Sequence, residues 1–263
     1  MNDNTALFIF DFDGTLVKGH SHNYIGKWLG GLIAANIQNR FFSSYDERDK
    51  EKARLEQKFS IELMEVFLDS NKLGWKNEEQ LICLFKNIIS SGHKIAIASF
   101  NDYHHAVKYA LEQLLDKEIV KNIYIKSGLP SNNFQEIQNC TKKEYIREII
   151  NNTGVTNKKN VFFMDDDIKH VNAAKDYGIT AVLVENKGKE HIHQACNFLY
   201  KFNEQHEIYV DFKDTDTEFF LSEKDLRETI PFDPCSDDYY LNSEEYTPWG
   251  EGNVPTLGNS SSF

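Results

Sequence analysis

Cysteine, proline and long apolar runs are scarce in this 263-residue sequence, and each scarcity excludes a class of protein. The four cysteines lie far apart and form no CxxC pair, so we expect reduced thiols and neither a disulfide framework nor a zinc knuckle. No segment approaches the ~20 apolar residues that cross a bilayer, and the amino terminus lacks a basic stretch followed by an apolar one. We therefore expect a cytoplasmic protein with no transmembrane segment and no amino-terminal signal peptide.

Positive charge is scarce in one region only. Fifteen of the 41 acidic residues lie from residue 204 onward, against three of the 29 Lys and Arg, so the net charge of −12 belongs to this region and residues 1–203 are balanced. An acidic tail repels nucleic acid and anionic membranes, which excludes them as its partners. We interpret residues 204–263 as an acidic, aromatic, partly disordered C-terminal extension. It either lies back on the core or serves as a docking or delivery segment for an unknown partner.

Within residues 1–203, short apolar runs alternate with stretches of helical spacing. The spacing predicts a helix over residues 77–91. It also predicts a second helix that starts from a Thr141 cap and ends near Gly154. Alternation of this kind predicts an α/β fold, a Rossmann-like doubly wound parallel sheet. The five runs of strand length are residues 6–11, 94–99, 123–127, 161–165 and 180–185.

Acidic side chains follow two of these strands at the sheet edge where ligands bind in such folds. Asp11 and Asp13 come after the first strand, Ser99 ends the second, and Asp165, Asp166 and Asp167 follow the fourth. Carboxylates gathered in one cleft would repel each other and raise their own pKa values. A hard divalent cation relieves that repulsion, and oxygen ligands suit Mg²⁺. The alternative, that each aspartate only caps the following helix, is common for one residue and accounts poorly for several.

Three segments resemble motifs of the haloacid dehalogenase (HAD) superfamily. DFDGTLV at residues 11–17 looks like the first motif, and Ser99 after IAIA looks like the second. DDDIKHVNAAKDYG at residues 165–178 looks like the fourth, with its paired acids, alanine pair and glycine at the family's spacing. The likeness covers roughly residues 6–186. It implies a HAD phosphatase, akin to the small-capped bacterial effector phosphotyrosine phosphatases that join such a core to an extra C-terminal segment.

The resemblance implies a mechanism and a set of site residues. Asp11 would attack phosphorus and form an aspartyl-phosphate, and Asp13 would protonate the leaving oxygen and then deprotonate the attacking water. An acid at the position of Asp13 favours a phosphatase or phosphomutase. Mg²⁺ would be held by the Asp11 carboxylate, the Asp13 main-chain carbonyl and Asp165, with Asp166 ligating directly or through water. The predicted substrate-binding residues are Ser99, Lys142, Lys143, Gly14, Phe100 and Asn101.

The sequence departs from the family pattern at one position and is ambiguous at another. His170 stands where relatives usually carry asparagine, and we expect it to act on the surroundings of the metal at most. The third motif, a lysine at the start of a helix, fits either Lys142 or Lys143. The spacing to the apolar Ile146 favours Lys142.

Residues 18–75 separate the first two motifs and contain two stretches with apolar faces. They predict a small helical cap or flap inserted into a catalytic core of residues 1–17 and 76–203. A small cap leaves the cleft partly open, so the substrate would be a phosphorylated small molecule or a phosphoprotein.

These features predict a Mg²⁺-dependent phosphomonoester hydrolase, and two alternatives stay open. One is a protein-tyrosine phosphatase effector that is delivered into a host cell without an amino-terminal signal peptide. The other is a catalytically silent protein that uses the fold only to bind. The intact set of Asp11, Asp13, Ser99, the lysine and Asp165 argues against silence, because loss of one of them is how silence usually arises.

Overall fold

The computed structural model describes residues 4–38, 40–70, 73–130, 136, 139–185 and 189–208. The chain divides into two units, Met1–Phe220 and Leu221–Phe263. The second unit, and with it most of the predicted extension over 204–263, lies outside the described residues. Among the residues that are described, no helix combines the length and the apolar character needed to cross a membrane.

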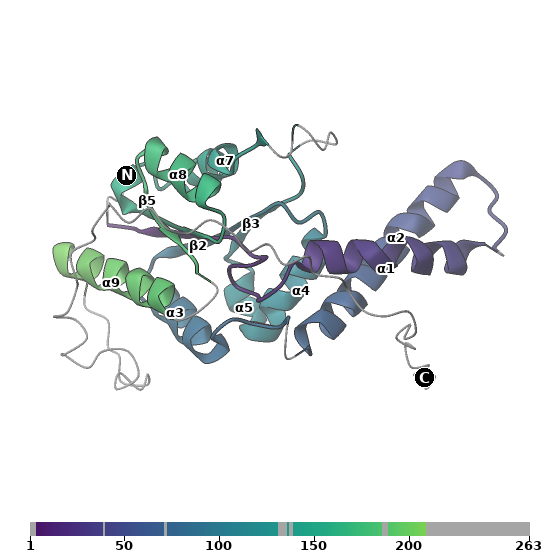
Figure 1. The fold of residues 1–263 in the computed structure, drawn as a ribbon, viewed down its shortest axis with the longest axis horizontal. Helices are drawn as coiled ribbons and strands as arrows, with labels where there is room; N and C mark the ends of the chain where they lie inside the picture. The colour runs from purple at the N-terminus through teal and green to yellow at the C-terminus, as the bar shows by residue number, and fades with distance from the viewer. Residues whose placement is uncertain are drawn as a thin grey trace, which may run out of the picture. The chain divides into compact units, whose positions relative to one another are not determined.

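Five parallel strands form one sheet in the order β3-β2-β1-β4-β5 (Figure 1). Each strand overlaps one of the five apolar runs predicted from the sequence, so the predicted α/β fold with a parallel sheet is confirmed. The strands are β1 (Leu7–Phe10), β2 (Lys94–Ser99), β3 (Tyr124–Ser127), β4 (Val161–Asp165) and β5 (Thr180–Leu183).

Helices cover both faces of the sheet (Figure 1). Because successive side chains of a strand point to opposite faces, Leu7 and Ile9 pack in one apolar cluster with α7 and α8, whereas Phe8 and Phe10 pack in another with α3, α4 and α9. Burial on both sides explains why the strands lack apolar–polar alternation. The helices of these layers are α3 (Glu78–Ser90), α4 (His104–Leu114), α5 (Lys117–Val120), α7 (Lys143–Thr153), α8 (Ile168–Tyr177) and α9 (Glu190–Gln205).

The start of α7 differs from the prediction. The N-cap position belongs to Lys142, with no side-chain cap, so the predicted cap by Thr141 is wrong. The first helical hydrogen bond runs from the Ile146 N–H to the Lys142 carbonyl at 2.9 Å. The helix ends at Gly154 as predicted, where φ is +73° and a glycine is favoured.

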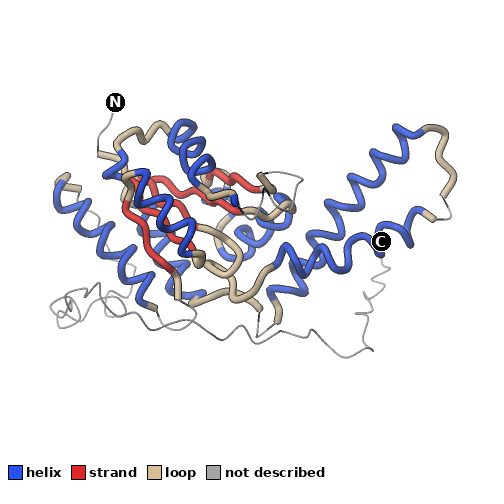
Figure 2. Tube along the Cα trace, turned by 45° about the horizontal axis from the view of Figure 1, so that its top comes forward, coloured by secondary structure: helices blue, strands red, loops and turns tan. Residues whose placement is uncertain are grey.

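The insertion between β1 and α3 contains the two predicted helical stretches, now α1 (Ser21–Ile37) and α2 (Tyr45–Leu68). The two helices pack against each other as a hairpin, and α2 also packs against α4 (Figure 2). The base of the insertion is closed by an antiparallel bridge between Val17 and Trp75. The insertion is therefore tied to the core at the point where the chain leaves β1.

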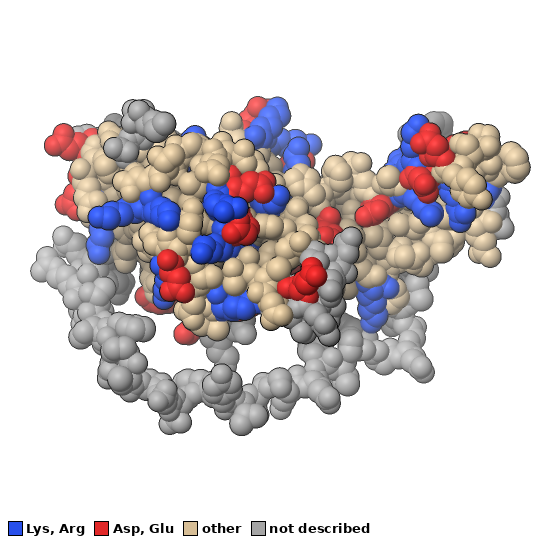
Figure 3. Space-filling model, turned by 90° about the horizontal axis from the view of Figure 1, so that it is seen from above, with Lys and Arg blue, Asp and Glu red and all other residues tan. Residues whose placement is uncertain are grey.

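Acidic and basic side chains are interspersed on the face of the molecule shown in Figure 3. On α2 they form pairs one helical turn apart, such as Lys50 with Asp46 at 2.8 Å and Arg54 with Glu51 at 2.7 Å. Exposed pairs of this kind contribute little to stability but keep a long helix solvated. Among the described residues on this face, acidic and basic side chains form no large patch of a single charge.

Replacing a core residue of β1 tests the layered arrangement. Ile9 is fully buried between the sheet and the helices α7 and α8. We expect Ile9→Ala to lower the free energy of unfolding by about 2–5 kcal/mol, because the cavity is not refilled. Urea denaturation measures this, with Ile168→Ala, at an exposed position of α8, as the control. Equal losses in the two variants would contradict the packing.

Candidate active site

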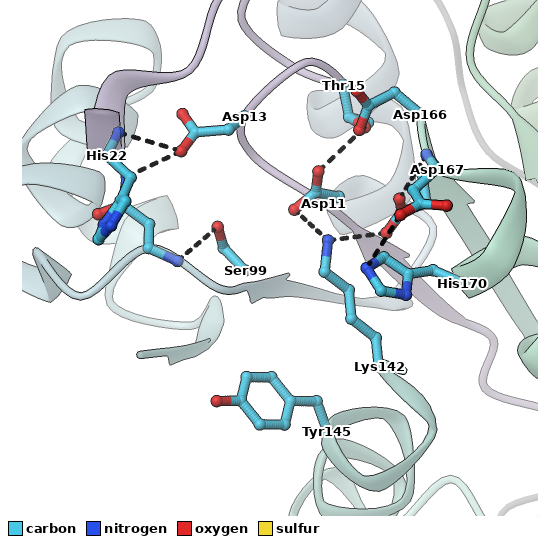
Figure 4. Close-up of polar contacts among 12 residues, drawn as sticks. Asp11, Asp13, Thr15, His22, Ser99, Lys142, Tyr145, Asp166, Asp167 and His170 are labelled. Carbon is cyan, nitrogen blue, oxygen red and sulfur yellow. Dashed lines mark hydrogen bonds and ion pairs between the residues drawn. The ribbon is translucent and has the colours of Figure 1, made fainter. Parts of the chain in front are cut away.

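A buried ion cluster lies at the carboxyl edge of the sheet (Figure 4). The Lys142 ammonium lies 2.5 Å from Asp11 Oδ1 and 2.8 Å from Asp165 Oδ2. The three residues are only 3, 4 and 0% exposed, respectively. Charges can be buried this deeply only when they are paired, because an isolated charge loses its hydration.

The strand register explains how residues so distant in sequence meet. Phe10 of β1 pairs with Met164 of β4, so the two strands end level. Asp11 follows β1 directly, and its N–H donates to the Met164 carbonyl at 2.9 Å, while Asp165 is the last residue of β4. Lys142 reaches the same edge from the start of α7.

A third carboxylate, Asp166, completes an all-oxygen cluster. One oxygen from each of Asp11, Asp165 and Asp166 lies within 4.8 Å of the others. The Thr15 hydroxyl lies between two of these groups, 3.3 Å from Asp11 Oδ2 and 3.5 Å from Asp166 Oδ1. Carboxylate oxygens grouped in this way fit a hard divalent cation such as Mg²⁺.

The turn that carries Asp11 and Asp13 requires glycine at position 14. Gly14 has φ +74°, and a Cβ atom there would lie 2.1 Å from Asp166 Oδ2. A side chain at this position would therefore displace the third carboxylate. Gly14 thus serves the site by letting Asp166 approach the backbone.

Burial and mutual repulsion shape the charges of the cluster. Burial raises the pKa of Asp166 to about 6, the Asp11 carboxylate adds to the rise, and Lys142 opposes it. Burial also raises the pKa of Asp165. The Asp11 carboxylate adds to this rise, and Lys142 opposes it. For Lys142, burial alone lowers the pKa, but Asp11 and Asp165 raise it well above its usual value. The lysine therefore stays charged.

Asp13 points away from Asp11, toward the start of α1 (Figure 4). It accepts hydrogen bonds from the Ser21 N–H at 2.8 Å, the Ser21 hydroxyl at 2.5 Å and the His22 N–H at 3.2 Å. The N–H groups of Ser21 and His22 belong to the first turn of α1, where a helix leaves such groups unsatisfied, so Asp13 caps α1 from outside the helix. Burial raises the pKa of Asp13, with hydrogen bonds from Ser21 opposing the rise.

Three predicted substrate-binding residues follow one another at the end of β2. The Ser99 hydroxyl is buried and accepts a hydrogen bond from the Asn101 N–H at 3.3 Å. Asn101 is buried, and its side-chain amide donates to Asp13 Oδ2 at 3.1 Å and to the Ser21 hydroxyl at 2.8 Å. Phe100 lies under Lys142, whose ammonium is 5.5 Å from the ring centroid. The structure thus places Asn101 against Asp13.

The two candidate lysines of the third motif lie in different surroundings. Lys142 lies in the ion cluster, whereas Lys143 is exposed and its ammonium lies over the Tyr177 ring, 5.9 Å from the centroid. Only one of the two is brought to the carboxylates. Adjacent residues at the start of a helix point about 100° apart, so they cannot both face the sheet edge.

His170, the departure from the family pattern, is buried beside the cluster. Its Nε2 lies 3.7 Å from Asp167 Oδ2, its ring meets Phe100 edge-on at 5.2 Å, and its Nδ1 has no hydrogen-bond partner. Burial lowers the pKa of His170 to about 4, and the neighbouring Lys142 adds to this effect. A neutral imidazole therefore packs next to the charged lysine.

Three residues near the site were not singled out from the sequence. Thr15 touches two carboxylates, and Ser21 holds Asp13. Lys76 donates a hydrogen bond from its ammonium to the Gly14 carbonyl. The hydroxyl of Thr15, two residues after Asp13 in the same turn, was a usable signal. Nothing in the local pattern around Ser21 or Lys76 indicates a contact with residues 13 and 14.

The raised pKa of Asp166 predicts a stability effect in the metal-free protein. Its pKa is higher in the folded than in the unfolded chain, so the ionised group opposes folding, and this effect grows as the pH rises through about 6. With EDTA at pH 7.5, Asp166→Asn should raise the free energy of unfolding by on the order of 1 kcal/mol after solvent screening is taken into account. This corresponds to a rise of about 2–4 °C in Tm. The gain should vanish by pH 4. Thermal melts check this, with Asp176→Asn on the exposed side of α8 as control, and an unchanged or lower Tm at pH 7.5 contradicts it.

Comparisons with known proteins found structural likeness only. No protein-family model matches the sequence, and no curated protein matches it. Among solved structures, the chain is similar to a haloacid dehalogenase-like hydrolase from Streptococcus pneumoniae, with 15% identity and a TM-score of 0.41 over 73% of this chain and 91% of that one. It is similar to a HAD-superfamily hydrolase from Ehrlichia chaffeensis, with 15% identity and a TM-score of 0.42 over 74% and 98% of the chains. It is also similar to the HAD domain of the effector protein Lem4 from Legionella pneumophila, with 16% identity and a TM-score of 0.47 over 79% and 99%.

Proposed function

We propose that this protein is a Mg²⁺-dependent phosphomonoester hydrolase of the haloacid dehalogenase type that acts through an aspartyl-phosphate on Asp11. The observation that carries the proposal is the buried contact of Lys142 with Asp11 and Asp165. A cation and a set of carboxylates at the ligand-binding edge of a parallel sheet suit phosphoryl transfer, which needs positioning and charge stabilisation above all.

The donor set supports a magnesium ion. Asp11, Asp165 and Asp166 each offer a carboxylate oxygen within 4.8 Å of the others, and no softer ligand stands among them. When bound there, Mg²⁺ would polarise the phosphoryl group and offset the charge of the cluster. Asp11, Asp165 and Asp166 would hold it.

Asp11 would act as the nucleophile. Lys142 holds one of its oxygens and the Thr15 hydroxyl holds the other, so the carboxylate is fixed in orientation. Attack of Asp11 on phosphorus forms the aspartyl-phosphate and breaks the bond to the leaving oxygen. Water then attacks the phosphorus, releases phosphate and restores the carboxylate. Lys142, with Ser99 at the end of β2, would bind the phosphoryl oxygens.

Asp13 would supply and remove the proton in these two steps. Burial raises the pKa of its carboxyl group, which favours the protonated form that a general acid needs. The acid donates its proton to the leaving oxygen, and the resulting carboxylate then takes a proton from the attacking water. Two aspartates in one turn thus take different roles, since one lies beside a lysine and the other does not.

The finer alternatives concern the substrate. The substrate could be a phosphorylated small molecule or a phosphoprotein, and for an effector it would be phosphotyrosine on a protein. These substrates differ in size and in their leaving group. Each of them stays a prediction. A panel of sugar phosphates and phosphotyrosine peptides, measured at fixed Mg²⁺, separates them. Absence of p-nitrophenyl phosphate hydrolysis, with and without Mg²⁺, would favour the binding-only alternative.

Removing the nucleophile tests the proposal most directly. We expect Asp11→Asn to lower kcat for p-nitrophenyl phosphate by at least about 10³-fold, because an amide cannot form the acyl phosphate. Asp167→Asn is the matched control, since its side chain accepts from the Lys169 N–H at the start of α8 and asparagine caps helices as well. Steady-state rates of the wild type and the two variants measure this loss, and circular dichroism verifies that each variant is folded. An Asp11→Asn enzyme at the wild-type rate would refute it.

The loss of rate on removing the Asp13 carboxyl group should depend on the leaving group of the substrate. We expect Asp13→Asn to lower kcat by ~10²–10⁴-fold for an alkyl phosphate. The loss should be smaller for p-nitrophenyl phosphate, whose leaving group departs without being protonated. Rates of both substrates with wild type and variant measure the difference, and equal losses would speak against a role in leaving-group protonation.

A further inference from the structure

Lys76 is a buried cation near the candidate site for which the reaction above assigns no role. It is 7% exposed, and its ammonium donates a hydrogen bond to the carbonyl oxygen of Gly14. Burial lowers the pKa of Lys76, while the carboxylates of Asp166 and Asp11 oppose this change. The side chain therefore approaches the carboxylate cluster from outside the motifs that compose it.

The backbone of Lys76 is fixed to the same turn as its side chain. Its N–H donates to the Leu16 carbonyl at 2.8 Å, next to the bridge between Val17 and Trp75. Lys76 is the point where the insertion of α1 and α2 returns to the core, two residues before α3 begins. Main chain and side chain together thus hold the segment from Gly14 to Leu16.

We propose that Lys76 is a positioning residue: by binding the Gly14 carbonyl it fixes the turn that carries Asp11 and Asp13. The inference rests on the proposed phosphatase function. Gly14 directly follows Asp13, and a Cβ atom on Gly14 would lie 2.1 Å from Asp166 Oδ2, so a rotation of this peptide would displace the carboxylates of Asp13 and Asp166. Displacements of about 1 Å cost on the order of 10²-fold in rate.

The competing explanation is that Lys76 only closes the base of the insertion. In that case its loss would lower stability and leave the turnover of the folded enzyme unchanged. A role in positioning predicts the opposite pattern, because methionine has nearly the same length, fills the buried space and lacks both the charge and the donor. The main-chain hydrogen bond to Leu16 remains in such a variant.

Kinetics of the full chain separate the two explanations. We expect Lys76→Met to lower kcat by at least 10-fold with KM within about 3-fold of wild type and a cooperative thermal melt, and Lys76→Arg to recover much of the loss. Lys94→Met is the matched control, because Lys94, the exposed first residue of β2, also donates to a main-chain carbonyl, that of Thr153. A kcat within 2-fold of wild type for Lys76→Met overturns the proposal. If Lys76→Met does not fold, Lys76→Leu, which also lacks the charge and the donor, replaces it with the same expectations, and failure of both to fold also overturns the proposal.

A second measurement does not depend on activity or metal. The carbonyl carbon shift of Gly14 is read through the Thr15 N–H in an HNCO spectrum of the metal-free protein, and it reports the hydrogen bond that the Gly14 oxygen accepts. It should move in Lys76→Met and stay in place in Lys94→Met. An unmoved Gly14 resonance contradicts the proposal even if the rate falls. Wild-type protein that hydrolyses no phosphate ester would instead refute the proposed function, and the resonance would still test the contact of Lys76.

Discussion

The contact of Lys142 with Asp11 and Asp165 is the interaction on which the rest of the site depends. Removing three charged side chains from water is unfavourable, and it is tolerated because the Lys142 ammonium lies at hydrogen-bonding distance from both carboxylates and offsets part of their negative charge. That contact requires β1 and β4 to be neighbours and to end level, and it requires α7 to begin directly above them. The sheet order and the helix start are thus the means by which the fold places one cation between two carboxylates.

The environment, more than the sequence spacing, distinguishes Asp11 from Asp13. The first is held by a lysine and a threonine at the sheet edge. The second is turned toward Ser21 and His22, and burial raises its pKa. Separate environments of this kind allow two identical side chains to take different roles, as a nucleophile and as an acid.

The helical insertion is attached to the candidate site at both of its ends. On the outgoing side, Asp13 satisfies the first N–H groups of α1, and Asn101 donates to both Asp13 and Ser21. On the returning side, Lys76 binds the turn through its main chain and its side chain. The position of the hairpin and the geometry of the turn that carries Asp11 and Asp13 therefore depend on each other.

The sequence by itself determined the five strands, the helices of the insertion and the gathering of Asp11, Asp165 and Asp166 at one edge, because strands and helices follow from short-range pattern and the carboxyl ends of parallel strands lie at one edge of a sheet. The spacing to Ile146 favoured Lys142 over Lys143, and the tertiary structure places Lys142 at the carboxylates; only the tertiary structure turned Asn101 toward Asp13. It also shows that the N-cap of α7 is Lys142 and not the predicted Thr141, and that Lys76 contacts Gly14. These outcomes depend on the direction of single side chains and on contacts between residues far apart in the chain. Periodicity within a short window carries no information about either.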